Sequence, residues 1–185
     1  MVQAIRSTLT SIAVAASLSA QGSTWSQVAT GGNHPSIRDA HCVAYDPIRA
    51  TIVLFGGYRA PSGSNVFLSD TWEYDGSTWS PITTATHPPA REQHAMAFDS
   101  QRGRCVVFSG NVGTGIKPSD TWEYSGNNWS LKSTSTSPIG RSGHSMVYDP
   151  VRDRIVLFGG VSNNYPALDD TWEYDGTDWT QIQTA

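Results

Sequence analysis

The sequence repeats itself with a period of 50 residues, and this repeat constrains the fold more than any other feature. DTWEYDG stands at 70–76, DTWEYSG at 120–126 and DTWEYDG again at 170–176. A tryptophan follows each copy, three residues after its last glycine, and an apolar run precedes each copy: IVLFGG, CVVFSG or IVLFGG. Such self-similarity is typical of repeat architectures, in which each unit buries its apolar faces against its neighbours.

Each unit is predicted to form four short strands, named a to d in chain order. In the first unit they cover His41–Tyr45, Ile52–Phe55 and Thr71–Tyr74, and strand d carries Trp79. Strand b is a continuous apolar run, which predicts a strand covered on both faces. Asp46-Pro47 predicts a tight a–b turn and Asp75-Gly76 a c–d hairpin. A four-stranded antiparallel sheet of this length, repeated, is typical of a propeller blade.

The units resemble Kelch repeats, the blades of Kelch-type and galactose-oxidase-type propellers. The shared landmarks are a double glycine after strand b, a tyrosine in strand c and a tryptophan in strand d: Gly56, Gly57, Tyr74 and Trp79; Gly110, Tyr124 and Trp129; Gly159, Gly160, Tyr174 and Trp179. Two departures are Ser109 in place of the first glycine and a Tyr–Trp spacing shorter than usual in the family, which we interpret as a shorter c–d hairpin. The resemblance implies an all-β fold but not a function.

The predicted domain covers residues 21–185, with blades at about 38–81, 91–131 and 141–182. One extra strand is expected at 22–28, because GSTWS at 22–26 matches GSTWS at 76–80. Three blades are fewer than the usual four to eight. We therefore expect a partial propeller: an open arc, a piece of a longer protein, or a subunit that completes a ring by self-association.

Residues 1–20 have the layout of a secretory signal. Arg6 is their only charged residue, an apolar stretch runs from Leu9 to Leu18, and small residues precede a cleavage site near Ala20. We expect an exported protein that is secreted, periplasmic or on the cell surface. The alternative is an N-terminal extension of the domain.

Charge and composition exclude several classes of protein. The net charge of −4 gives no basic footprint for nucleic acid, and there is no apolar run long enough for a membrane span. Cys42 and Cys105 would allow one disulfide in an exported protein, but both fall inside apolar strands. We favour their interpretation as small buried apolar residues.

No catalytic motif is present, and we expect neither a metal nor another cofactor. Glu73 recurs at the same phase as Glu123 and Glu173, as a structural residue does. The best metal candidates are three histidines at the start of strand a: His41, His94 and His144. Their repetition favours hydrogen bonds to the neighbouring blade instead. The copper site of galactose oxidase has no assignable counterpart here.

Recognition is expected in the loops that differ between units, because a rigid scaffold concentrates function in its loops. These are the b–c loops at 58–69, 111–119 and 161–169 and the d–a loops at 81–90 and 131–140, on one end of the blades. The nominated binding residues are Tyr58, Arg59, Lys117, Asn163 and Tyr165, with Arg91 and Arg141 of the repeated arginines. For Arg38, Arg91 and Arg141 the alternative is pairing with Asp70, Asp120 or Asp170.

The sequence thus predicts an exported, non-enzymatic module that binds protein or carbohydrate through these loops. The alternative is a remnant of a galactose-oxidase-type or sugar-processing propeller enzyme.

Overall fold

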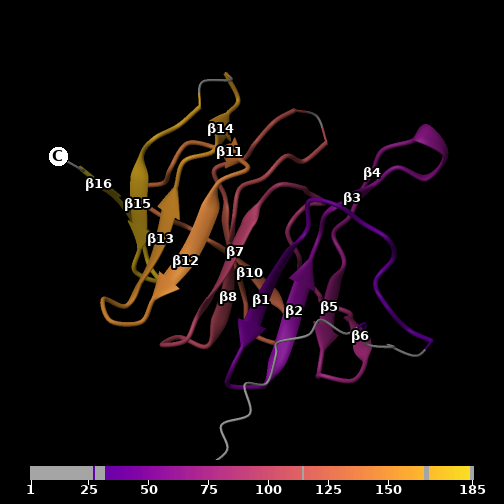
Figure 1. Ribbon diagram of the computed structural model, residues 1–185. Helices are drawn as coiled ribbons and strands as arrows, with labels where there is room; N and C mark the ends of the chain where they lie inside the picture. Colours follow the sequence, from indigo (N-terminus) through magenta and orange to yellow (C-terminus); the bar gives the residue numbers. More distant parts are fainter. Residues whose placement is uncertain (1–26, 28–31, 114, 165–166, 184–185) are drawn as a thin grey trace, which may run out of the picture.

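Three four-stranded antiparallel sheets, one for each repeat unit, stand side by side as blades (Figure 1). The computed structural model describes residues 27, 32–113, 115–164 and 167–183. Blade 1 comprises β1 (Cys42–Asp46), β2 (Thr51–Phe55), β5 (Thr71–Tyr74) and β6 (Trp79–Ile82). Blade 2 comprises β7 (Ala95–Asp99), β8 (Arg104–Phe108), β9 (Thr121–Tyr124) and β10 (Trp129–Lys132). Blade 3 comprises β12 (Ser145–Asp149), β13 (Arg154–Phe158), β15 (Thr171–Tyr174) and β16 (Trp179–Ile182).

The order of strands in each sheet follows the chain, so strand a lies at one edge and strand d at the other. The three a strands adjoin, with β7 between β1 and β12. The predicted all-β, partial propeller of three blades is confirmed, and the predicted strands agree to within about one residue at each end. The predicted signal at 1–20 and, apart from Gln27, the predicted extra strand at 22–28 lie outside the described residues.

Short elements occupy one end of the blades. They are the ribbon of β3 (Tyr58–Arg59) and β4 (Val66–Phe67), the 3-10 turn η1 (Pro61–Gly63) between them, and the ribbon of β11 (Arg141–Ser142) and β14 (Val161–Ser162). The a–b and c–d turns lie at the opposite end (Figure 1). In the described part of the chain, no helix is long and apolar enough to cross a membrane.

Aspartate side chains close both kinds of turn, as the sequence predicted. Asp46 Oδ1 accepts hydrogen bonds from the backbone nitrogens of Ile48 and Arg49 at 2.9 and 3.1 Å. In the c–d loop, Asp75 Oδ1 accepts from the backbone nitrogens of Ser77 and Thr78 at 2.8 Å each. Tyr74 pairs with Trp79, so the hairpin loop has the four residues 75–78, with Gly76 at φ +97°. The aspartate thus stabilises a longer loop than a two-residue Asp-Gly turn.

Neighbouring blades bury two apolar clusters between them. Between blades 1 and 2, Val53 and Phe55 pack with Val107, Tyr124 and Trp129; between blades 2 and 3 the residues at equivalent positions pack in the same way. The landmark tryptophans Trp129 and Trp179 are 1% exposed. Burying a tryptophan requires a partner for its indole nitrogen. Thr71 and Thr121 of the preceding blades accept these bonds, both at 2.9 Å.

The second glycine after strand b allows the blade to bend back towards its own strand a. Gly57 and Gly110 have φ of +100° and +102°, and a Cβ at Gly57 would lie 2.7 Å from the Asp39 carbonyl oxygen. Ser109, which departs from the family pattern, is buried at φ +52°. Its hydroxyl accepts a hydrogen bond from the Arg141 backbone nitrogen at 2.8 Å, so this serine contributes a contact to blade 3 that a glycine cannot make.

Both cysteines are unpaired. Cys105 is buried in the first cluster, and the Cys42 thiol donates to the His94 carbonyl oxygen at 2.7 Å. Burial raises the pKa of each thiol to about 12, so both stay protonated at neutral pH. This arrangement agrees with the interpretation of Cys105 as a small buried residue, whereas Cys42 is only half-buried.

Replacing Trp129 by alanine should reduce the free energy of unfolding by about 3–5 kcal/mol, because it empties a large buried site between two blades. Leu131→Ala is the control, since Leu131 is 57% exposed on the outer strand β10 of blade 2. Urea unfolding of both variants checks this. Equal losses in the two variants would contradict the assigned role of the interface.

Candidate functional site

The b–c loops and the segments that lead into strand a gather at one end of the blades, which we call the loop face (Figure 1). This confirms that the two sets of loops share one end. In each blade a backbone bridge joins the two segments: Asp39 to Tyr58, Glu92 to Asn111, and β11 to β14. For Asp39 and Tyr58 the two backbone hydrogen bonds are 2.8 and 2.9 Å long. The loop face therefore has a constant backbone pattern that carries different side chains in each blade.

Blade 1 carries a pocket of about 210 Å³ beside its bridge. The wall combines apolar and charged groups from both segments: Ile37, Arg38, Asp39, Tyr58, Arg59 and Ala60. The Arg59 Nε atom is buried and has no hydrogen-bond partner among the described residues. A buried donor without an acceptor is costly, and it marks a place where a ligand can supply one. The structure thus brings the nominated pair Tyr58 and Arg59 together in one wall.

A second pocket of about 150 Å³ lies at the corresponding place in blade 3. Its wall contains Ile139, Gly140, Ser162, Asn163 and Asn164. The Asn163 side chain lines this pocket and also forms hydrogen bonds to the b–c loop of blade 2. Its Oδ1 accepts from the Lys117 backbone nitrogen at 2.7 Å, and its Nδ2 donates to the Lys117 carbonyl oxygen at 3.1 Å.

Lys117 is not at the surface as nominated, since it is only 8% exposed. Its ammonium group donates to the Ser162 carbonyl oxygen at 3.2 Å. The structure therefore corrects the roles expected for Lys117 and Asn163: together they join the b–c loops of blades 2 and 3. Tyr165, the fifth nominated loop residue, lies outside the described residues.

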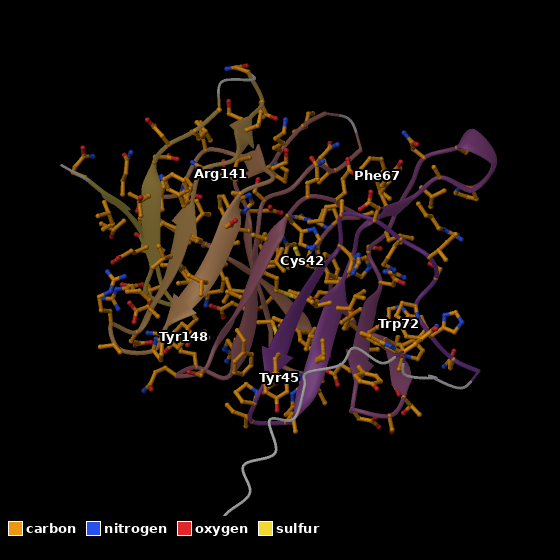
Figure 2. All side chains as sticks on the ribbon, viewed as in Figure 1. Cys42, Tyr45, Phe67, Trp72, Arg141 and Tyr148 are labelled. Carbon is orange, nitrogen blue, oxygen red and sulfur yellow. The ribbon has the colours of Figure 1, made fainter. Side chains whose placement is uncertain are left out.

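Each repeated arginine lies beneath the loop face and forms hydrogen bonds inside its own blade. Arg91 and Arg141 are fully buried, and Figure 2 shows Arg141 at the loop end of blade 3. Arg91 forms two bonds to the Asp120 carboxylate, at 2.8 and 2.7 Å, and one to the Ser109 carbonyl oxygen at 2.8 Å.

Arg38 with Asp70 and Arg141 with Asp170 repeat the arrangement of Arg91. The Arg141 guanidinium holds the pKa of the Asp170 carboxyl below its usual range. These are the pairings with Asp70, Asp120 and Asp170 that the sequence offered as the alternative to ligand binding. This pairing corrects the nomination of Arg91 and Arg141 as ligand-binding groups, because their donors are occupied inside the blade.

The strand-a histidines contact the neighbouring blade through their rings. His94 packs edge-on against Phe55 with ring centres 5.5 Å apart, and His144 packs likewise against Phe108 at 5.7 Å. By strict geometry the ring nitrogens of these two histidines have no hydrogen-bond partner among the described residues, although the Phe55 and Phe108 backbones of the preceding blades interact with them as expected of hydrogen bonds. Burial, and less strongly the adjacent Arg91 or Arg141, lower the pKa of each to about 3, so both are neutral. The backbones of Phe55 and Phe108 oppose this lowering weakly.

The described residues contain no group of three or more His, Cys, Asp or Glu side chains placed to hold a metal ion. Two of the three repeated glutamates bond to the following blade: Glu73 Oε1 accepts from the Tyr124 hydroxyl at 2.8 Å, and Glu123 Oε1 from the Tyr174 hydroxyl at 3.0 Å. Sequence reasoning missed Ile37 and Asp39 as pocket residues. The sequence held one signal for them: each of these two positions carries a different residue in every unit, whereas the arginine between them is the same in all three.

A family model described as the KLHDC2/KLHL20/DRC7 Kelch-repeats domain matches residues 10–185. No curated protein matches the chain.

Acidification should weaken the fold through His94 and His144. The unfolded chain binds these protons near pH 6.5 and the folded chain only near pH 3. Between these values the unfolded state holds more protons, so stability falls as the pH decreases, by up to about 1.4 kcal/mol per pH unit for each histidine. Urea unfolding from pH 7 to about pH 4.5 measures this slope. His94→Phe should flatten it, whereas an unchanged slope in that variant, or an equal change in exposed His34→Ala, would contradict the assignment.

Gly140→Ala should destabilise the loop face. A Cβ at this position would lie 1.7 Å from the Lys117 carbonyl oxygen, so the two segments must separate. We expect a loss of about 1–3 kcal/mol, as for other overpacking substitutions. Ser133→Ala, on an exposed residue of the same d–a loop, is the control and should leave thermal unfolding unchanged. An unaltered melting temperature for Gly140→Ala would show that this close approach does not constrain the loops.

Proposed function

Because the chain belongs to the Kelch-repeat family, whose propeller domains are protein-interaction modules, we propose that it is an exported, non-enzymatic module that binds a protein partner through its loop face. The family supplies the class of module. The finer statement, that a peptide segment of the partner enters the blade 1 pocket, is supported by the geometry of that pocket.

The observation that carries the proposal is Arg59, which lines the pocket and whose buried Nε atom has no hydrogen-bond partner among the described residues. An arginine side chain prefers a planar acceptor such as a carboxylate, which it binds through two parallel hydrogen bonds. Unlike Arg38 beside it, Arg59 forms no ion pair among the described residues. An acidic side chain of the partner would satisfy the buried donor.

The rest of the pocket favours a peptide over a sugar. Ile37, 87% exposed, offers an apolar contact for a neighbouring side chain of the partner. Sugar binding generally uses the open face of an aromatic ring beside polar groups. The Tyr58 ring is half-buried and packs against Phe67, with ring centres 6.2 Å apart. Carbohydrate recognition, the other ligand class expected from the sequence, therefore has less support.

Two parts of the proposal rest on the sequence alone. Export rests on the pattern of residues 1–20, with its single basic residue and apolar stretch. The absence of an enzymatic role rests on the lack of a nucleophile paired with a base. The alternative, a remnant of a galactose-oxidase-type enzyme, predicts a copper-dependent oxidation at the same face.

The test selects peptides from a random display library on the full chain and measures their affinity. Selected peptides should share an acidic residue. Arg59→Ala should weaken their binding tenfold or more, because a hydrogen bond between charged groups contributes about 1.5–3 kcal/mol. Arg59→Lys should not restore binding, since lysine lacks the planar fork. Asn164→Ala, in the blade 3 pocket, is the matched control and should bind normally.

Three results would contradict the proposal. The first is unchanged affinity in Arg59→Ala. The second is binding to a glycan array with no peptide selected. The third is release of hydrogen peroxide from sugars by the copper-treated chain, which would favour the enzyme alternative.

A further inference from the structure

The same set of contacts joins blade 1 to blade 2 and blade 2 to blade 3. The strand-d tryptophan donates a hydrogen bond to a strand-c threonine of the preceding blade. The strand-c tyrosine donates one to a strand-c glutamate of that same preceding blade. The strand-a histidine packs on the preceding blade's strand-b phenylalanine. The second glycine after strand b also donates its backbone N–H to the next blade's arginine carbonyl: Gly57 to Arg91 at 2.8 Å, and Gly110 to Arg141 at 3.0 Å.

Among the described residues, one half of this set is unused on blade 1. We call its outward side the leading face; it carries His41, Val43, Tyr45, Tyr74 and Trp79. Val43 and Tyr45 are 51% and 57% exposed, although Met96, at the position of Val43 in blade 2, is buried. No hydrogen bond from the Tyr74 hydroxyl or the Trp79 indole is formed among the described residues. The leading face thus offers two donors and an apolar surface.

No described residue uses the other half of the set, which lies on blade 3. Its outward side, the trailing face, carries Val147, Phe158, Gly160, Thr171 and Glu173. Phe158 is 56% exposed, whereas Phe55 and Phe108 at the same position are fully buried. Val147 is 62% exposed, whereas its counterparts Ala44 and Ala97 are buried. The trailing face thus offers the acceptors and the phenylalanine that the leading face lacks.

We propose that the occupant of each exposed face is a second copy of this chain, joined leading face to trailing face. Trp79 Nε1 of one copy would then donate to Thr171 of the other, the Tyr74 hydroxyl to Glu173, and His41 would pack on Phe158. Gly160 would donate its N–H to the Arg38 carbonyl oxygen. Each pairing repeats one that blades 1 and 2 already make.

A further pairing comes from Arg152. Its equivalent Arg49 bonds to Glu73 and lies over the Tyr124 ring of the next blade, 5.7 Å from the ring centre. Arg152 also bonds to its glutamate, Glu173, but its side chain is 54% exposed. A leading face would place the Tyr74 ring over this guanidinium and add a cation–π contact.

The chain cannot join its own two faces, because blade 2 separates blades 1 and 3, which stand at opposite sides in Figure 1. Two copies in this arrangement form two identical contacts related by a twofold axis, and a contact between unlike faces closes a ring when the rotation permits. Six blades fall within the usual size of propellers. A second copy also covers both apolar faces, which in repeat proteins otherwise require polar caps.

The experiment measures the mass of the full chain in solution by sedimentation equilibrium over a hundredfold dilution series. We expect twice the monomer mass of 20.0 kDa. Phe158→Asp should give a monomer, because it places a charge in the contact. Leu131→Asp is the matched control: Leu131 is 57% exposed but lies on the outer strand β10 of blade 2, so this variant should stay dimeric. Circular dichroism verifies that both variants fold.

Mixing two variants tests which faces meet. Tyr45→Asp alters the leading face, since Tyr45 is an exposed residue of β1 (Figure 2), and Phe158→Asp alters the trailing face. Each should be monomeric alone, and their mixture should form a heterodimer through its one intact pair of faces. A folded wild-type monomer at all concentrations, or a dimer that survives Phe158→Asp, would overturn the proposal. A Tyr45→Asp variant that still dimerises would show contact between two trailing faces and would also overturn it.

Discussion

The structure depends on the packing of each sheet against a neighbouring sheet. A Kelch blade has apolar residues on both sides, as the continuous runs of β2, β8 and β13 show, so one blade alone leaves both apolar sides in water. Blade 2 is covered on both sides, and its strand β8 is almost entirely buried. The hydrogen bonds from Trp129 and Tyr124 to blade 1 satisfy the polar atoms that this burial would otherwise leave unpaired.

The contacts that repeat in every blade could be predicted from the sequence, whereas the contacts that differ from blade to blade could not. Trp129 and Glu73 recur at a fixed phase, and a position that recurs in every unit serves the repeat itself, either inside a blade, as Arg91 does, or between blades, as Trp129 does. The histidines show the limit of that reasoning. Their phase predicted a contact with the neighbouring blade, but only the structure reveals that the His94 ring packs edge-on against Phe55 and stays neutral.

The candidate site was predictable by region and only partly by residue. Loops that differ between units were identified correctly as one face, and Tyr58 and Arg59 do line its pocket. Lys117 and Asn163 have the same polar character in sequence, yet the close approach of two b–c loops commits them to each other. Which polar loop residues are consumed by such contacts depends on distances between segments about 45 residues apart in the chain, and a single sequence does not contain those distances.

One pair of residues marks the order of the blades. Arg102 of blade 2 forms an ion pair with Asp153 of blade 3, with bonds of 2.7 and 2.8 Å. At the junction of blades 1 and 2, the position of Asp153 is occupied by Gly103, so the corresponding arginine, Arg49, finds no carboxylate there. An exposed ion pair adds little stability. Repeat proteins, however, misassemble when units dock out of order, since every junction offers the same contacts. Arg102 and Asp153 give one junction a feature that the other lacks, so another blade docked in the place of blade 3 would lose this ion pair.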